Sequence, residues 1–382
     1  MQLFKQKKIA FINYWPEDTG IGKYALNLCE QLEGKCNINE VFLNYDNRSI
    51  ERLAGNSRHT LAKVNRLPLI DNKPLFWYRI KNTIPEYDLY HLVNPNPTPI
   101  LLKSNTIKKN LFIVTCLDLL RYANPQSKLD HLAGRYIYPS LRNVDKVISI
   151  SEFTKRELIK YVGVCEENIR IVYLGLDHKI YKPVSENRAI LQKFGLPEDV
   201  KVILYVGSEL PRKNLPTLIK AFGELRKQYG NVKLIKVGNA HSSHGRKKLM
   251  KLINELGLDN DVIFTGVVPE GELPQLYNAA DLYVYPSIYE GFGMPILEAM
   301  ACGCPVIISK AAALPEVAGD AAIAVDLYDI DAWVKAMYSM LTDDSLKNQM
   351  IGKGLERAKI FSWDKTARET TKVYEEVLSI LL

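Results

Sequence analysis

The sequence has no apolar run long enough to cross a lipid bilayer, so we expect no segment that spans a membrane. A signal-peptide cleavage site of small residues is also missing from the first residues, MQLFKQKKIAFINYW. We interpret these residues as the start of a first β-strand and expect a cytoplasmic protein. None of the six cysteines belongs to a C-x-x-C pair, which favours free thiols in a reducing compartment.

The chain also has no stretch rich enough in lysine and arginine to indicate a nucleic-acid partner, and its net charge of +7 is modest. Basic residues gather in two short groups, for which two interpretations stay open. They form either a solvated surface or a face that attracts an anionic membrane or a phosphorylated substrate. The two groups are Lys5, Lys7 and Lys8, and Lys103, Lys108 and Lys109.

What the sequence does contain is enough residues for two domains and a repeated alternation of strand and helix patterns. Its 382 residues, 47% hydrophobic and 24% charged, exceed what one ordinary core takes up and indicate a folded protein. Strand patterns followed by helical patterns predict parallel sheets with helices on both faces. The expected strands are residues 8–14, 39–44, 88–93, 111–116 and 145–150, then 201–207, 231–238, 261–265, 281–286 and 305–308.

The alternation pauses around residues 175–200, where turn residues and two prolines surround a short helical stretch. We therefore predict an α/β protein of two Rossmann-like, doubly wound domains that face each other across a cleft. The first domain is expected to span residues 1–178 and the second residues 179–362, followed by an amphipathic helix over residues 363–382. Ligands of such sheets bind at the carboxyl ends of the strands. The motifs described next all lie at strand-to-helix junctions.

One junction carries two glutamates around a glycine-rich turn, in the segment YEGFGMPILEAMACGCPV. Gly291 and Gly293 let backbone N–H groups approach a ligand closely, and Pro295 suits the first turn of a helix. The start of that helix favours a negatively charged group such as phosphate. We expect Glu298 to hold the two hydroxyls of a ribose and Glu290 to accept hydrogen bonds from sugar hydroxyls. Stabilisation of the helix dipole explains either carboxylate alone, but not the glycines between them.

Two further junctions carry glycines or cations. In the segment GSELPRKN, Arg212 and Lys213 stand at a helix start, where the helix dipole disfavours positive charge. A bound diphosphate would resolve this conflict, whereas the alternative is a pair of solvated surface cations. In the segment TGIGKYA, Gly20 and Gly22 indicate close approach of the backbone to a ligand. That motif lacks the third glycine and the acidic residue of a dinucleotide fingerprint.

Together these motifs resemble those of retaining glycosyltransferases with two Rossmann domains, the GT-B fold, of the large family 4 type that includes bacterial mannosyltransferases. The resemblance covers nearly the whole chain and is strongest over residues 201–325. It implies a nucleotide-diphosphate sugar as the donor substrate, and the last matching segment is similar to mannosyltransferases that use GDP-mannose. The matching segments are residues 19–22, 211–214, 290–303, 305–306 and 314–320.

This resemblance implies roles for individual residues. The catalytic residues would be Glu290, Arg212, Lys213 and Asp118. The donor-binding residues would be Gly20, Gly22, Gly207, Val267, Phe292, Gly293, Met294 and Glu298, with the nucleotide base near residues 266–268 and the diphosphate between the two cations. No metal ligand and no cofactor are expected, because the cations and the helix start do the work of a metal ion. The C-terminal helix around Trp363 would cross back onto the first domain.

Some positions depart from the pattern of the family. Leu117 stands before Asp118 where many relatives have a histidine that helps to hold the transferred sugar, which puts turnover or donor preference in question. His91 ends another expected strand, and it is either an acceptor-side residue of the same cleft or a histidine satisfied within the core. Ser208 stands where relatives often have arginine, so Arg212 would carry more of the phosphate charge.

Two other patterns resemble metal ligands but have a structural explanation. Cys302 and Cys304 flank a single glycine, and we expect both to pack as small core residues beside a strand. The segment Asp329-Ile330-Asp331 precedes a predicted helix, where we expect an N-cap.

The expected activity is the transfer of a hexose, with mannose as the best guess, to a hydroxyl of a saccharide or a lipid-linked acceptor, as in polysaccharide biosynthesis. We find no protein base in the sequence. In the family precedent, a donor phosphate oxygen takes the acceptor proton on the front face, so we expect retention of the anomeric configuration. The alternatives are an epimerase or hydrolase of the same fold and a nucleotide-sugar-binding protein without turnover. Peripheral contact with a membrane stays open, and the oligomeric state does not follow from the sequence.

Overall fold

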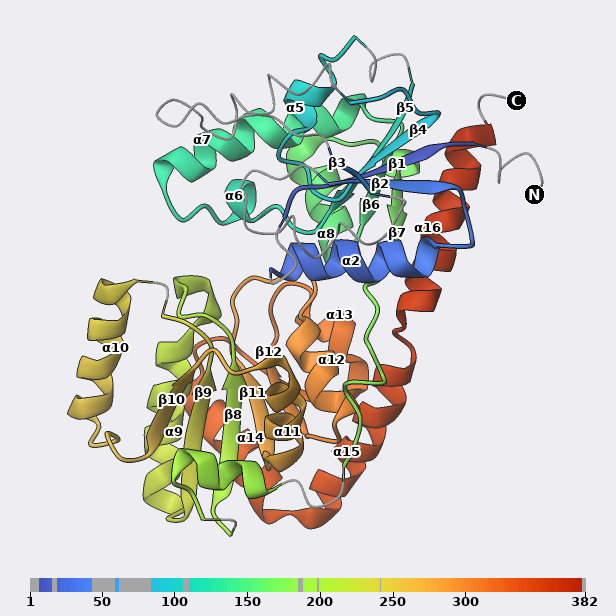
Figure 1. Cartoon of the computed structure of the whole chain (residues 1–382). Helices are drawn as coiled ribbons and strands as arrows, with labels where there is room; N and C mark the ends of the chain where they lie inside the picture. The colour runs from blue at the N-terminus through green and yellow to red at the C-terminus, as the bar shows by residue number, and fades with distance from the viewer. Residues whose placement is uncertain are drawn as a thin grey trace. The chain divides into compact units, whose positions relative to one another are not determined.

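The computed structural model describes residues 7–15, 19–42, 59–61, 84–105, 110–184, 188–197, 199–240 and 242–379. The chain divides into two compact units, each of which is described by itself (Figure 1). Residues 1–175 and 363–382 form the first unit, and residues 176–362 form the second. The first boundary thus falls after residue 175 rather than after residue 178. Lys5, Lys108 and Lys109 of the two basic groups lie outside the described residues.

The first unit is built on a seven-stranded sheet in which all neighbouring strands are parallel, in the order β3-β2-β1-β4-β5-β6-β7. The strands are β1 Ile9–Asn13, β2 Ile38–Phe42, β3 His59–Leu61, β4 Leu89–Leu92, β5 Leu111–Cys116, β6 Lys146–Ser149 and β7 Ile169–Ile171. The central strands β1, β4 and β5 are buried along their whole length. Continuous burial is typical of strands in a parallel sheet with both faces covered.

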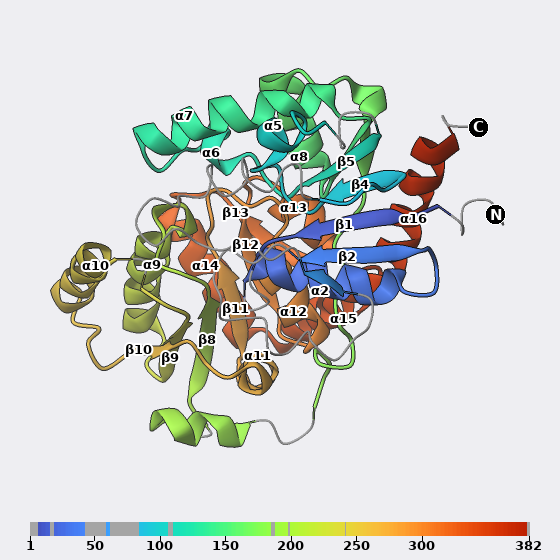
Figure 2. The same cartoon turned by 45° about the horizontal axis from the view of Figure 1, so that its top comes forward.

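Helices connect these strands, and the last helix of the chain joins them. They are α2 Gly20–Leu32, α5 Thr98–Leu101, α6 Leu120–Ala123, α7 Lys128–Ile137, α8 Glu152–Glu157 and α16 Trp363–Leu378. A π-helical turn, Leu158–Val162, follows α8, and 3-10 turns lie at Tyr138–Asn143 and Glu166–Asn168. Helix α16 packs against α2 in this unit, where the rings of Tyr24 and Trp363 lie 6.2 Å apart (Figure 2).

The second unit repeats this architecture with a six-stranded parallel sheet in the order β10-β9-β8-β11-β12-β13. The strands are β8 Lys201–Val206, β9 Val232–Val237, β10 Val262–Gly266, β11 Leu282–Tyr285, β12 Val306–Ser309 and β13 Ala322–Val325. The sheets of both units therefore confirm the prediction of two doubly wound α/β domains.

The helices of the second unit cover its sheet in packed pairs, with α9 against α14 and α12 against α15. They are α9 Leu215–Gln228, α10 Ser243–Glu255, α11 Leu273–Ala279, α12 Met294–Ala301, α13 Leu314–Ala318, α14 Ile330–Thr342 and α15 Asp344–Lys359. 3-10 turns lie at Arg188–Phe194, Pro211–Lys213, Glu270–Glu272 and Gly319–Ala321.

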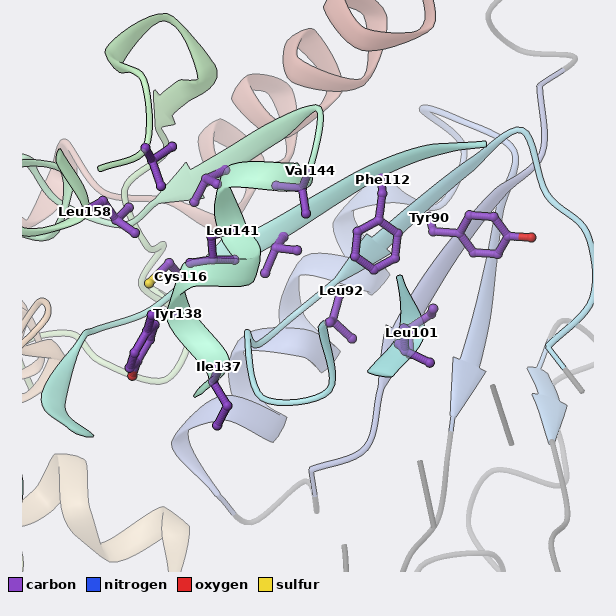
Figure 3. Close-up of a cluster of buried hydrophobic side chains, with 14 of the residues drawn as sticks. Tyr90, Leu92, Leu101, Phe112, Cys116, Ile137, Tyr138, Leu141, Val144 and Leu158 are labelled. Atoms are coloured by element: carbon purple, nitrogen blue, oxygen red, sulfur yellow. The ribbon is translucent and has the colours of Figure 1, made fainter. Parts of the chain in front are cut away.

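A cluster of buried side chains fixes the central strands of the first unit (Figure 3). Tyr90 of β4 and Phe112 of β5 lie in this cluster with ring centroids 6.4 Å apart. Leu141 of the 3-10 turn and Leu158 of the π-helical turn belong to the same cluster. Burial of this apolar surface, at about 25 cal/mol per Å², holds the helical layer on the sheet.

The structure differs from the expected elements at strand ends and in three short strands. The expected strand ends are within one or two residues of the observed ones wherever both lie among the described residues. Strands β3, β7 and β13 were not expected. Strand β7 has three residues, and β13 has the sequence AIAV, in which alanine is a weak strand former. Helix α2 begins at Gly20, because the Thr19 side chain caps it by accepting the N–H of Gly22.

No helix among the described residues is both long and apolar enough to cross a membrane.

Candidate active site

The two cations of the segment GSELPRKN lie in a short 3-10 turn between β8 and α9. Pro211 opens this turn, and Asn214 closes it in the left-handed region, with φ of +52°, before α9 begins. Asparagine tolerates that conformation better than most residues. The backbone N–H of Ile288 donates to the carbonyl oxygen of Arg212 at 2.7 Å, so the turn is joined to the loop after β11. Both loops lie at the carboxyl ends of neighbouring strands.

The carboxylate of Glu290 lies between these two cations. Its Oε1 is 2.8 Å from Nη1 of Arg212 and 2.6 Å from Nζ of Lys213. The same oxygen accepts hydrogen bonds from the hydroxyl of Ser287 at 2.6 Å and from that of Tyr285 at 3.0 Å. The Lys213 ammonium also donates to the Tyr285 hydroxyl. One carboxylate oxygen thus holds both cations.

Burial and charge act against each other in this cluster. Burial raises the pKa of Glu290, but the charges of Lys213 and Arg212 and the hydrogen bonds from Lys213 and Ser287 outweigh this effect and lower the pKa to about 2. Burial lowers the pKa of Lys213, and the carboxylate opposes that shift. The interpretation of the two residues as solvated surface cations is wrong, because Lys213 is only 8% exposed. With two cations and one carboxylate, the cluster carries a net positive charge.

Helix α12 begins directly after this loop. Gly293 caps it with φ of +110°, a conformation that favours glycine, and a Cβ there would force Cδ2 of Leu314 to shift from a distance of 2.9 Å. Pro295 stands in the first turn, as expected. The first N–H groups of a helix point away from it and favour an anion. Residues 292–294 therefore place backbone donors beside the loop that holds Glu290.

Glu298 lies one turn inside α12, and its Oε2 accepts a hydrogen bond from the Tyr277 hydroxyl at 2.8 Å. Tyr277 is fully buried on α11 and belongs to a series of tyrosine rings. Its ring lies 5.5 Å from that of Tyr283, which lies 5.8 Å from that of Tyr285. Buried tyrosine rings therefore connect Tyr277, which donates to Glu298, with Tyr285, which donates to Glu290.

Three glycines end three adjacent strands of the same sheet. The N–H of Gly207 donates to Val237 at 2.9 Å, and the N–H of Gly238 donates to Gly266 at 2.7 Å. A Cβ on Gly238 would lie 2.6 Å from the carbonyl oxygen of Gly207, so no other residue fits there. A Cβ on Gly266 would meet no atom within 4 Å, and Val267 beyond it is 65% exposed. The end of β10, where we expected the base, is therefore open.

A second ionic cluster, which the sequence reasoning missed, lies beside these glycines. The Glu209 carboxylate is 3.0 Å from Nζ of Lys236 and accepts hydrogen bonds from Nε and Nη2 of Arg246. The side chains of Lys236 and Glu209 are 0% and 3% exposed. A lysine in the buried strand VKLIKV was the available signal, because a buried charge requires a partner.

The candidate residues of the first unit lie at two strand ends. Gly20 and Gly22 form the first turn of α2 after β1, and Gly22 is buried. Asp118 follows β5, is half-buried, and its Oδ1 accepts the N–H of Leu120 at 3.0 Å. These residues belong to a different unit from Glu290 and Glu298. Their roles toward the donor stay predictions.

The structure corrects the assignment of His91 as an acceptor-side residue. Its ring is 0% exposed, with Nδ1 2.6 Å from the Tyr374 hydroxyl and Nε2 2.8 Å from the Thr115 hydroxyl. Burial lowers its pKa to about 3, so the ring is neutral. Both ring nitrogens have partners inside the core, which supports the alternative of a satisfied core histidine.

The structure also confirms that Cys302 and Cys304 are core residues and that Asp329 is a helix cap. Cys302 and Cys304 are buried free thiols, at the end of α12 and before β12. The Asp329 side chain caps α14 by accepting the N–H of Ala332 at 2.9 Å.

The sequence was also compared with known protein families and with known proteins. A profile described as Glycosyltransferase Family 4 matches residues 19–180, and one described as Glycosyl transferases group 1 matches residues 186–357. The chain is 29% identical over 376 residues to the O-antigen chain mannosyltransferase B of Escherichia coli, covering 94% of this chain and 96% of that one.

Two solved structures have the same fold. Sucrose-phosphate synthase from Thermosynechococcus elongatus superimposes with a TM-score of 0.81 at 23% identity, over 98% of this chain and 100% of that chain. Anabaena Alr3699/HepE, solved in complex with UDP-glucose, gives 0.81 at 20% identity, over 97% of this chain and 100% of that one. With two parallel-sheet units and both profiles matched, the chain belongs to the family 4 type of GT-B glycosyltransferases.

Proposed function

We propose that this glycosyltransferase moves a hexose, with mannose as the best candidate, from a nucleoside-diphosphate sugar to a hydroxyl of a saccharide or lipid-linked acceptor. The observation that carries this proposal is the buried cluster of Arg212, Lys213 and Glu290, whose net positive charge suits a diphosphate. The mannosyltransferase name of the Escherichia coli relative supports mannose from GDP-mannose and a role in polysaccharide synthesis. The UDP-glucose bound to the HepE neighbour supports a nucleotide-sugar donor.

In this proposal, the diphosphate binds to the two cations and replaces part of their contact with Glu290. Fixed cations and the N–H groups at the start of α12 stabilise the negative charge that develops on the leaving diphosphate. When the diphosphate shares Arg212 and Lys213, Glu290 loses part of its ionic contact and accepts hydroxyls of the transferred sugar. Glu298 holds the ribose with a carboxylate that the Tyr277 hydroxyl orients. Each of these roles uses a group that the protein holds in place before the ligand arrives.

The transfer itself needs no protein base. The bond between the anomeric carbon and the diphosphate oxygen breaks, and the acceptor oxygen bonds to the same face of that carbon. The acceptor proton passes to a phosphate oxygen of the leaving group, so the anomeric configuration is retained. The two protein cations supply the charge that a divalent ion supplies elsewhere, and we propose turnover in the presence of EDTA. An NMR assay that shows the inverted anomer would reject this mechanism.

A donor screen followed by two variants tests the proposal. Purified protein is titrated with nucleotide sugars by calorimetry, and nucleoside diphosphate release is then followed with candidate acceptors. We expect Lys213→Ala to slow transfer about 100-fold and Glu298→Ala to weaken donor binding by about 10-fold or more. Lys233→Ala is the matched control, since this lysine pairs with Asp261 at 2.6 Å on the amino side of β10. Unchanged kinetics in both variants would reject the site.

One observation favours a second candidate, a nucleotide-sugar-binding protein without turnover: Leu117 stands before Asp118 where many relatives have a histidine. Tight donor binding without diphosphate release, with any acceptor tried, would support it. Release of free sugar with no acceptor present would indicate a hydrolase instead, and conversion of the donor sugar to its epimer would indicate an epimerase.

We also propose that the first unit contacts an anionic membrane through α7. Leu129, Leu132 and Tyr136 are 78%, 62% and 55% exposed, and their spacing places them on one face of this helix. Lys128 and Arg135 are exposed beside that face, a composition typical of interfacial helices. We expect binding to phosphatidylglycerol vesicles, weaker binding to phosphatidylcholine vesicles, and loss of both in Leu132→Glu. Equal binding by this variant would reject the contact.

A further inference from the structure

The further inference concerns Arg246, in the first turn of α10, and it rests on the proposed function. We propose that Arg246 selects guanine as the base of the donor nucleotide. The proposed activity leaves open which nucleoside diphosphate the site accepts. The cluster around Arg212 does not decide this, because a diphosphate is common to all candidate donors. A residue that reads the base must therefore lie elsewhere in the second unit.

Arg246 is held on one edge and on one face of its guanidinium group. Nε donates to both carboxylate oxygens of Glu209, at 3.0 and 2.9 Å, and Nη2 donates to Oε1. The guanidinium carbon lies 4.3 Å from the centre of the Phe264 ring. Glu209 is itself held by the buried ammonium of Lys236 at 3.0 Å. The arginine is therefore fixed in orientation before any ligand binds.

One end of the guanidinium group remains for a ligand. Within the part of the chain that the structure describes, Nη1 has no hydrogen-bond or ion-pair partner, and the side chain is 30% exposed. Glu209 uses the Nε edge, so the hydrogens at the Nη1 end are those available for donation. An arginine keeps five N–H donors in a rigid planar arrangement, which makes two parallel hydrogen bonds possible from this end.

The neighbourhood of this end matches the place expected for the base. Phe264 lies on β10, two residues before Gly266, where added side-chain atoms would meet nothing within 4 Å. Gly238 donates to Gly266, so the ends of β9 and β10 adjoin each other, and the end of β10 is open. A planar base lying against these glycines would have its edge beside Arg246. The diphosphate would then extend past Gly207 toward Arg212, along the loop that also carries Glu209.

The chemistry of the bases makes this arrangement selective. Guanine presents two adjacent acceptors, O6 and N7, to which an arginine donates both hydrogen bonds. Adenine replaces the first acceptor with an amino donor, and uracil has no second acceptor of this kind. A good pair of such bonds discriminates against the wrong base by a factor of about 10 to 100. Arg246 would therefore favour GDP-linked donors over those linked to UDP or ADP.

Calorimetric titration with GDP, UDP and ADP tests this inference on the full chain. Arg246→Met keeps an apolar stem against Phe264 and removes the charged group, whereas Arg246→Lys keeps the ion pair with Glu209 but not the planar fork. We expect both variants to bind GDP about 10- to 100-fold more weakly and to bind UDP within about threefold of the unmodified protein. Arg226→Met is the matched control, since Arg226 is 32% exposed and pairs with Asp261 at 3.2 Å.

Each outcome separates the inference from the proposed function. Equal weakening for all three diphosphates in the Arg246 variants would overturn the inference, because it would mean a structural or phosphate-binding role. The same conclusion follows if the unmodified protein binds UDP or ADP as tightly as GDP, and donor binding as such would then still stand. If Arg246→Lys keeps full preference for GDP, the two-bond explanation fails. Absence of binding by all three diphosphates to the unmodified protein would reject the proposed function itself.

Discussion

A network of fully buried polar side chains in the first unit is neutral, whereas two buried clusters at strand ends of the second unit are charged. In the first unit, the Tyr24 hydroxyl lies 3.0 Å from that of Thr115, which lies 2.8 Å from His91. The other nitrogen of His91 is 2.6 Å from the Tyr374 hydroxyl. This neutral network joins α2, β5, β4 and α16. Its members satisfy one another, which is the condition under which buried polar groups cost little.

Two ionic clusters follow strand β8 of the second unit, and in each of them two cations share one carboxylate. Arg212 and Lys213 share Glu290, and Lys236 and Arg246 share Glu209 in the same way. Buried ion pairs add little net stability compared with apolar packing, because desolvation offsets their attraction. We infer from this difference that the neutral network serves the stability of the first unit. The charged clusters serve the binding of a negatively charged ligand.

The largest expected effect comes from removing the carboxylate of the first ionic cluster. Glu290→Gln leaves Arg212 and Lys213 buried beside a neutral amide, so we expect the free energy of unfolding to fall by about 3 to 5 kcal/mol. A bound diphosphate restores the missing negative charge. GDP should therefore raise the melting temperature of this variant more than that of the unmodified protein. An equal or smaller shift, measured in parallel thermal melts, would contradict this role of the cluster.

The next prediction concerns pH and the neutral network. The pKa of His91 is lowered by burial to about 3, so below pH 6.5 the unfolded chain binds a proton that the folded chain does not. Stability should fall by about 1.4 kcal/mol per pH unit between pH 6.5 and about 3 because of this residue. Glu290, with its pKa lowered to about 2, adds a loss of stability only below about pH 4.5.

His91→Gln tests this pH dependence, because glutamine keeps hydrogen-bonding groups but does not titrate. We expect the variant to be about 1 to 3 kcal/mol less stable at pH 7 and to lose less stability between pH 6.5 and 4.5. Denaturant titrations at several pH values provide the measurement. GDP affinity should stay unchanged, and a weaker affinity would mean that the two units do not divide stability and binding as we infer.

A smaller effect is expected from the tyrosine that holds Glu298. Tyr277→Phe removes the hydroxyl that donates at 2.8 Å but keeps the buried ring. We expect donor affinity to weaken by about 3- to 10-fold, since a hydrogen bond to a charged group contributes about 1 kcal/mol or more. The kcat should stay unchanged. Tyr338→Phe, on the exposed surface of α14, is the control. A drop in kcat with unchanged affinity would reject a positioning role for Tyr277.

The smallest expected effect concerns backbone strain beside the charged cluster. Ala312 has φ of +54°, a conformation that glycine adopts more easily, and the next residue donates its N–H to the carbonyl oxygen of Glu290 at 3.3 Å. Ala312→Gly should stabilise the protein by up to about 1 kcal/mol. Ala311→Gly, at a neighbour outside that conformation, should destabilise it. Thermal melts that place the two variants in the opposite order would show that position 312 is not strained.

Much of the fold could be predicted from the sequence because periodicity and turn residues are local signals. Buried runs such as LFIVTC indicated parallel strands, and the observed bounds of β5 are the expected ones. The short strand β13 lacked such a signal, since its alanines suit several structures. His91 shows the same limit at the level of one side chain. Its place in the chain suggested a site, but its partner Tyr374 is far away in the sequence.

For the candidate site, local motifs identified which residues carry the chemistry but not how they contact one another. Glycines, a proline and paired charges at strand-to-helix junctions identified these residues, because such motifs are visible within a short segment of the sequence. The residues are Glu290, Glu298, Arg212 and Lys213. The packing of separate strands then placed Glu290 against the two cations and brought Glu209 to Lys236 and Arg246. Contacts between residues distant in the chain depend on sheet order and burial, which no local pattern encodes.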